Sequence, residues 1–151
     1  MPRAHDAPAM NRSGVRLLPL AATTFMVGNL LHGADHVRRG WGLPLLGLTP
    51  EVLIGGFLLT IGAGVTLALA LTNNRLGPRV AVAVGFIAAI FVSAAHLAPP
   101  WGVLSNSYLA LRPDVFAWVV VLIEIGGAIF TGVAGLQALQ HGSEVMKTAG
   151  R

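Results

Sequence analysis

The side chains best suited to chemistry lie in one short segment and at two distant positions. Within the segment 28–36, His32 and His36 are four residues apart, so a helix places both imidazoles on one face. His96 and Glu124 stand in otherwise apolar stretches. Ionisable side chains are expensive to place in apolar segments, and those that occur there usually face a bundle interior or a functional site. The candidate site therefore consists of His32, His36, His96 and Glu124.

Three chemistries fit this set, and a purely structural role is a fourth interpretation. Three imidazoles and a carboxylate suit a transition metal such as zinc, copper or iron. A b-type haem would take one axial histidine from the first helix and His96 as the other. Histidines and Glu124 that titrate inside a low-dielectric bundle would form a proton or ligand path. In the structural interpretation, Glu124 bonds to a neighbouring helix and His96 caps its own helix.

Other polar residues near this set are expected to support it. Side chains that orient an imidazole or pair with an anionic cofactor are expected at Asn29, Asp35, Arg38, Arg39 and Arg112. Asp35 also has the spacing of ordinary ion pairs with Arg38 and Arg39 within one helix. A lid over the site is expected from Trp101, Asn106 and Tyr108. The alternative for this last segment is a rigid loop at the membrane boundary, where Trp and Tyr are common.

The elements that must position these residues are membrane-spanning helices. Hydrophobic residues make up 54% of the 151-residue chain and charged residues 11%, and the mean hydropathy is +0.72. A span needs about 20 apolar residues, and four stretches qualify, at about 15–36, 50–72, 80–97 and 113–139. Lipid leaves the edge of a strand unpaired, so each span is expected to be helical. The sequence predicts an all-α fold, a single four-transmembrane-helix up-down bundle, with mobile tails at 1–14 and 140–151.

The distribution of charge predicts the orientation of the bundle. Most of the ten Lys and Arg residues lie in the tails and the second connection, and only Arg38, Arg39 and Arg112 lie on the other side. The positive-inside rule therefore places both termini in the cytoplasm of a bacterial cell, with the chain as a multi-pass protein of its cytoplasmic membrane. His32, His36 and His96 then meet near the outer face, with Glu124 about one turn deeper.

Composition also limits the partners and activities to be considered. The absence of cysteine excludes disulfides, thiolate metal sites and iron–sulfur clusters. No basic run with interleaved aromatic residues suggests nucleic-acid binding, so the lipid bilayer is the expected surrounding. No nucleophile motif supports an enzyme with a soluble substrate.

Small residues recur at helical spacing in the last three spans. The rows include Gly56, Gly64, Gly85, Gly127 and Gly132. Such rows let helix backbones approach closely in lipid. They predict packing within one bundle or, alternatively, contact with a second copy or a larger membrane complex.

The segment His32-Gly33-Ala34-Asp35-His36 resembles the His and Asp-His signature in a transmembrane helix of nickel and cobalt permeases, over these five residues. The resemblance implies that His32, Asp35 and His36 handle ions. The overall plan is also similar to that of small four-helix membrane proteins of high-GC bacteria, which implies no activity. The leading interpretation is a membrane protein that binds a transition metal or haem for redox or metal handling. The alternative is an accessory subunit of a larger membrane complex without its own cofactor.

Overall fold

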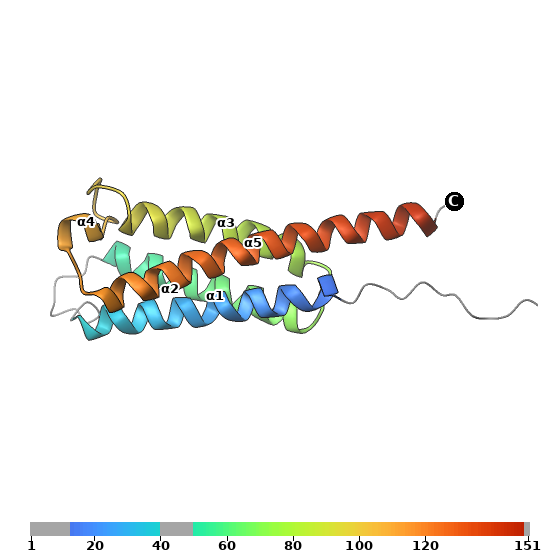
Figure 1. Ribbon diagram of the computed structural model, residues 1–151, viewed down its shortest axis with the longest axis horizontal. Coiled ribbons are helices and arrows are strands. Elements are labelled where there is room, and N and C mark those ends of the chain that lie inside the picture. Colours follow the sequence, from blue (N-terminus) through green and yellow to red (C-terminus); the bar gives the residue numbers. More distant parts are fainter. Residues whose placement is uncertain (1–12, 40–49, 150–151) are drawn as a thin grey trace, which may run out of the picture.

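The fold is a bundle of long helices, as the composition predicts. The computed structural model describes residues 13–39 and 50–149, and every regular element among them is a helix. The helices are α1 (Ser13–Arg38), α2 (Pro50–Leu71), α3 (Gly77–His96), α4 (Tyr108–Leu111) and α5 (Val115–Ala149). The four long helices lie side by side along one axis, and α4 is a short turn at one end (Figure 1). The predicted all-α four-helix fold is confirmed.

Each long helix contains an apolar stretch of sufficient length to cross a membrane. These stretches are Leu17–Arg38, Ile54–Leu71, Gly77–His96 and Val115–His141, close to the four predicted spans. The last helix differs from the prediction, because α5 continues to Ala149 and projects beyond the other three (Figure 1). The tail predicted from residue 140 is therefore helical as far as Ala149. The predicted tail at 1–14 lies outside the described residues, except for the start of α1.

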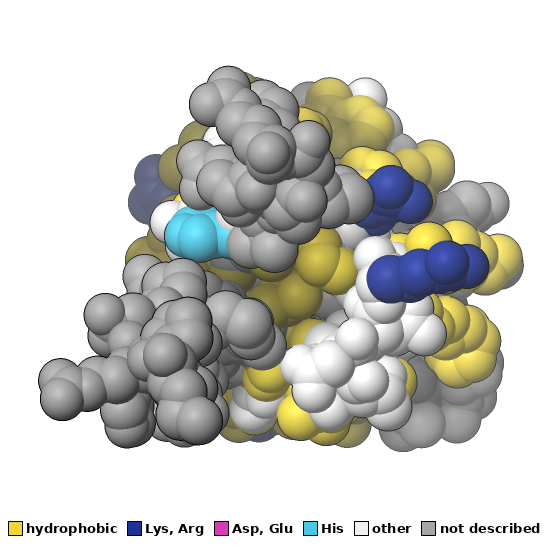
Figure 2. All heavy atoms as spheres, turned by 90° about the vertical axis from the view of Figure 1, so that its right-hand side faces the viewer, with side chains coloured by type: hydrophobic (Ala, Val, Ile, Leu, Met, Phe, Trp, Pro, Cys, Tyr) yellow, Lys and Arg dark blue, Asp and Glu magenta, His cyan; other side chains and the backbone are white. Residues whose placement is uncertain are grey.

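The up-down topology brings the candidate residues to one end of the bundle. The C-termini of α1 and α3 lie there together with α4, and we call this the site end (Figure 1). The start of α1, the turn between α2 and α3 and the end of α5 lie at the opposite end. Figure 2 faces that opposite end, and among its described atoms basic side chains are visible and acidic ones are not. The orientation that the positive-inside rule predicts from these basic residues stays a prediction.

Helix α5 is the central helix, and small residues let it pack closely against two neighbours. A Cβ atom added to Gly28 of α1 would lie 2.8 Å from Cα of Glu124, and one added to Gly127 would lie 2.8 Å from Cα of Phe25. Against α3, a Cβ atom on Gly85 would lie 2.6 Å from the backbone nitrogen of Gly132. Helices that approach this closely gain dispersion contacts, the main source of association in lipid. These glycines therefore fix the spacing of α1, α3 and α5.

Helix α2 packs less closely than the others. Only 17% of its spanning stretch is buried, against 56% for α5. A Cβ atom added to Gly56 or Gly64 would have nothing within 4 Å. These two glycines of α2 therefore make no close helix contact within the described residues, and the site-end half of α2 carries exposed apolar side chains such as Phe57 and Leu58.

Candidate metal centre

Three histidines meet at the site end. His32 and His36 project from α1, and His96 is the last residue of α3. One ligand atom from each lies within 4.8 Å of the others. The ring centroids of His36 and His96 are 4.5 and 4.6 Å from that of His32. The three histidines that the sequence assigns to one site do lie together, and His32 and His96 are buried.

Glu124 approaches His32 from the middle of α5. Its carboxylate contacts Nδ1 of His32, and its other oxygen accepts a hydrogen bond of 2.8 Å from the side-chain amide of Asn29. The hydroxyl of Thr60 on α2 donates to the amide oxygen of Asn29 at 2.8 Å. This chain of polar groups links three helices and fixes the orientation of His32. Because Glu124 occupies Nδ1, a ligand of His32 would bind at Nε2, which the hydroxyl of Tyr108 also approaches at 3.3 Å.

His96 is oriented by a backbone carbonyl. Its Nδ1 lies 3.1 Å from the carbonyl oxygen of Asn106, which accepts a hydrogen bond when Nδ1 carries the proton. The backbone amide of Asn106 donates in turn to the carbonyl of Ala95 at 2.9 Å, and the hydroxyl of Ser107 donates to the carbonyl of Ala98 at 2.6 Å. The segment before α4 is therefore tied to the end of α3, and the Nε2 atom of His96 is left for a ligand.

A second polar group connects the end of α1 to α4 and α5. Asp35 is buried and accepts hydrogen bonds from Arg38 at 2.8 Å and from Arg39 at 2.7 Å. Arg39 also donates to the hydroxyl of Tyr108 at 3.0 Å, and Arg38 donates to Asp114 at 2.7 Å. Asp35 thus contacts the two arginines, as the i,i+3 and i,i+4 spacing predicts, and Arg39 in turn contacts Tyr108 beside the imidazoles.

Tyr108 lies inside the cluster. It is 1% exposed, its hydroxyl is 3.3 Å from Nε2 of His32, and its ring centroid is 4.8 Å from that of His96. Burial raises the pKa of Tyr108 to about 12, and Arg39 opposes that rise. The phenol is therefore a neutral hydrogen-bonding group beside the histidines at physiological pH.

Two of the predicted supporting residues lie away from the cluster. Arg112 is exposed at the end of α4, in a left-handed conformation with φ 47°, and within residues 13–39 and 50–149 it makes no hydrogen bond or ion pair to the histidines. Trp101 is 52% exposed and its indole donates to the carbonyl of Ala94 at 2.7 Å. Of the three residues of the expected lid, only Asn106 and Tyr108 are buried against the site.

Thr60 is a supporting residue that the sequence analysis missed. It belongs to the small-residue row of the second span, and such a row indicates packing rather than hydrogen bonding. A hydroxyl inside an apolar span is the only signal in the sequence, and Thr72 and Thr131 give the same signal while bonding to their own helix.

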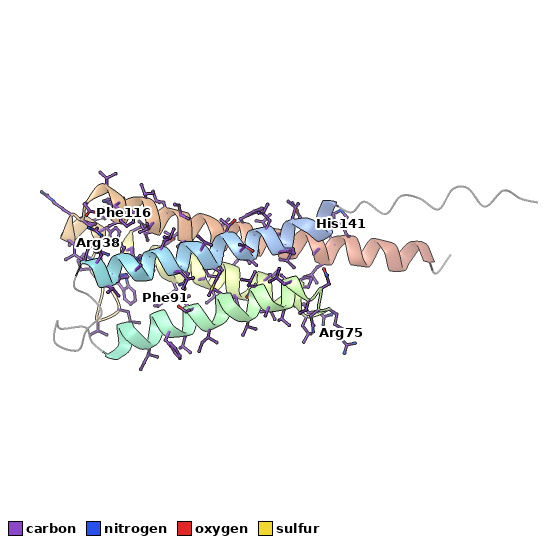
Figure 3. All side chains as sticks on the ribbon, turned by 90° about the horizontal axis from the view of Figure 1, so that it is seen from below. Arg38, Arg75, Phe91, Phe116 and His141 are labelled. Carbon is purple, nitrogen blue, oxygen red and sulfur yellow. The ribbon has the colours of Figure 1, made fainter. Side chains whose placement is uncertain are left out.

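A cavity adjoins the imidazoles between α1, α2 and α3. Its volume is about 370 Å³, and its lining includes the three histidines, Asn29, Thr60, Asn106 and Glu124. Apolar lining comes from Leu59, Phe91, Val92 and Leu104. Figure 3 shows Phe91 of α3 behind the space that separates α1 from α2. A small ligand in this cavity would lie directly beside the histidines.

Comparison with known proteins gives no match for this chain among family models, curated proteins or solved structures. The resemblance of the segment 32–36 to nickel and cobalt permeases stays a prediction. The chemistry of the site is therefore inferred from its own donor atoms.

Proposed function

We propose that the chain binds one transition-metal ion, zinc, copper or iron, between His32, His36 and His96, at the membrane face predicted to be the outer one. The observation that carries this proposal is the approach of three imidazole nitrogens to within 4.8 Å of one another. Metal–nitrogen bonds are about 2.0–2.1 Å long, so two nitrogens on one ion lie at most about 4.2 Å apart. Small rotations of the three side chains cover the difference.

The groups behind the imidazoles support a metal site. Histidine ligands commonly donate their second ring nitrogen to a carboxylate or a backbone carbonyl, which fixes the tautomer. Glu124 takes this position behind His32, and the carbonyl of Asn106 takes it behind His96. Glu124, which the sequence suggested as a ligand, is better placed to orient His32.

The same geometry favours an ion over a haem. A haem with two axial histidines separates their rings by the porphyrin plane. The ring centroids of His32 and His96 are 4.6 Å apart in an edge-to-face arrangement, and the centroids of His36 and His96 are 5.5 Å apart. The rings contact one another directly, so a macrocycle would have to displace them. Three histidines also leave an open coordination position, which water or another ligand can occupy.

The test is metal binding by the purified protein. We expect one equivalent of Co²⁺, used as a coloured substitute for zinc, to produce visible absorption bands that Zn²⁺ abolishes. Replacement of His32, His36 or His96 by Ala should each weaken binding at least tenfold. Glu124→Gln should weaken it by about 10- to 100-fold, the usual cost of losing a partner of a ligating histidine.

The matched control is His141→Ala. His141 is an exposed histidine at the opposite end of the bundle, bonded to the carbonyl of Gln137. The His141→Ala variant should bind Co²⁺ with the same affinity as the unchanged protein. Binding that survives replacement of all three clustered histidines, or no binding of Co²⁺, Cu⁺ or Fe²⁺ by a folded sample, would refute the proposal. A Soret band in the purified protein would favour haem instead.

An accessory subunit of a larger membrane complex is the second candidate. The observation in its favour is the open row of Gly56 and Gly64 on α2, where an added Cβ atom meets nothing within 4 Å. The rows of α3 and α5 are, by contrast, filled by contacts inside the bundle. Loss of a co-purifying membrane protein in Gly64→Leu, with unchanged folding, would support this role.

A further inference from the structure

The cavity beside the histidines contains a buried amide with unused hydrogen-bonding capacity. Asn106 is 3% exposed and lines the cavity. Within the described residues, neither its side-chain nitrogen nor its side-chain oxygen has a hydrogen-bond partner. A buried polar group without a partner is costly, and native structures keep few of them without a reason. The amide therefore points to a ligand that would bond to it.

Two other polar residues of the cavity wall, Asn29 and Glu124, are already engaged. Asn29 bonds to Glu124 and Thr60, and Glu124 also bonds to His32. The unused groups of Asn106 are the NH2 group, which donates, and the amide oxygen, which accepts. A hydroxyl group, which both donates and accepts, complements that pair. A carboxylate or ketone would satisfy only the donor, and an ammonium group only the acceptor.

The apolar walls and the position of the opening indicate the rest of the ligand. Phe57 and Phe91 lie at the wall, where aromatic side chains favour an aromatic ring in stacked or edge-to-face contact. The exposed residues of the lining include Gly33 and Val37 of α1 and Gly56 and Phe57 of α2, all within membrane-spanning stretches. The cavity therefore opens sideways between α1 and α2, toward lipid.

Near α4, Asn106 forms part of the cavity wall and is 3% exposed, and its backbone amide is bonded to the carbonyl of Ala95 in α3. The volume of about 370 Å³ is at the lower end of the range for small-molecule pockets. A ring with one hydroxyl fits inside this volume, and an alkyl tail would extend through the opening.

We infer that the cavity binds a lipid-soluble phenol or hydroquinone, which enters from the bilayer between α1 and α2 and places its hydroxyl group at the side chain of Asn106. The ring lies between the aromatic side chains, and the hydroxyl group lies beside the histidine cluster. The inference rests on the cavity and on Asn106, and it does not require the metal ion that we propose.

The test is equilibrium binding of 4-octylphenol to the protein in nanodiscs, with empty nanodiscs as the baseline. We expect saturable binding of one molecule per chain. The methyl ether, 4-octylanisole, lacks the donor and should bind about tenfold more weakly. Asn106→Leu should also weaken 4-octylphenol binding about tenfold, a loss of about 1.4 kcal/mol. The backbone carbonyl that holds His96 is retained in this variant.

A second pair of variants tests the opening. Gly56→Leu places a large side chain at the opening without a clash, and it should reduce binding at least tenfold. Gly64→Leu adds the same side chain two turns further along α2, also in open space, and should leave binding unchanged. Thermal unfolding of each variant establishes that it is folded.

The outcome is distinguishable from that of the metal proposal. Each measurement is made once after chelation and once with Zn²⁺ added, so phenol binding is scored even if no metal binds. No saturable binding above that of empty nanodiscs would overturn the inference. Binding that neither Asn106→Leu nor Gly56→Leu weakens would overturn it as well.

Discussion

The crossing of α1 and α5 at Gly28 should determine both stability and the geometry of the histidine cluster. Gly28→Ala adds a Cβ atom 2.8 Å from Cα and 3.0 Å from the backbone nitrogen of Glu124. Ordinary van der Waals contacts begin at 3.4 Å, so the two backbones must separate by about 0.6 Å, the difference between 3.4 and 2.8 Å. The obstacle is backbone rather than a flexible side chain, so no rotamer change can relieve it.

This separation acts directly on the polar contacts next to it. The hydrogen bond between Asn29 and Glu124 is 2.8 Å long and starts one residue from the clash. A shift of about 0.6 Å would lengthen it to about 3.4 Å, where hydrogen bonds are weak. His32 lies one turn further along α1 and would lose its contact with Glu124 in the same way. We expect metal affinity to fall by about 10- to 100-fold.

The expected loss of stability follows from overpacking, which costs about 1–3 kcal/mol. Gly126→Ala is the matched control, because an added Cβ atom there has nothing within 4 Å. The Gly126→Ala variant should gain up to about 1 kcal/mol in free energy of unfolding, because Ala has a better helix propensity than Gly. Reversible unfolding in mixed micelles, followed by circular dichroism, measures the stability of both variants. Titration with Co²⁺ measures their metal affinity. Equal stability and equal affinity of the two variants would refute the reasoning.

Two further predictions concern residues outside the spans. Asp114 accepts a hydrogen bond from the backbone amide of Ala117 and one from Arg38, and these lower its pKa below the usual 3.8. The carboxylate of Asp114 therefore stabilises the fold above pH 3.8, and this contribution is lost as the pH falls through the lowered pKa of the folded state. Asp114→Ala should lower the thermal unfolding midpoint at pH 7 and have no effect on it in strong acid. Tyr108 is the one tyrosine of the chain, so ultraviolet titration reports it alone, and we expect its phenol to ionise near pH 12 in the folded protein and near 10 after unfolding. Stability should accordingly decline as the pH rises from 10 to 12, whereas a folded-state titration near 10 would contradict the burial of this ring.

The fold and part of the site were predictable because they depend on local properties of the chain. A membrane span is a length of apolar sequence that must be helical, so hydropathy alone located the four helices. The i,i+4 spacing of His32 and His36 placed both on one face of α1. The alternation of helix directions then brought His96 to the same end. The ion pairs of Asp35 with the two arginines are equally local, because they lie within one helix.

Residues that meet across helices were harder to assign. Sequence reasoning placed Glu124 among the candidate ligands but did not identify its partners, which are His32 and Asn29 in the structure. A span that is apolar on every side does not reveal which face turns toward which neighbour, so the partner of Glu124 could not be read from periodicity. The rotation of α5 is set instead by the contacts of Gly127 and Gly132 with α1 and α3.

Loop residues were the least predictable. Asn106, Tyr108 and Arg112 all lie between α3 and α5, yet the first two are buried at the site and the third is exposed. Asn106 is held by a hydrogen bond to the end of α3 and Tyr108 by one from Arg39, contacts that the local sequence does not reveal. The sequence by itself determined which segments cross the membrane and which histidines share a helix face, because both follow from local helical geometry. Only the tertiary structure decided which polar groups meet, because that depends on how closely the glycines allow the helices to approach.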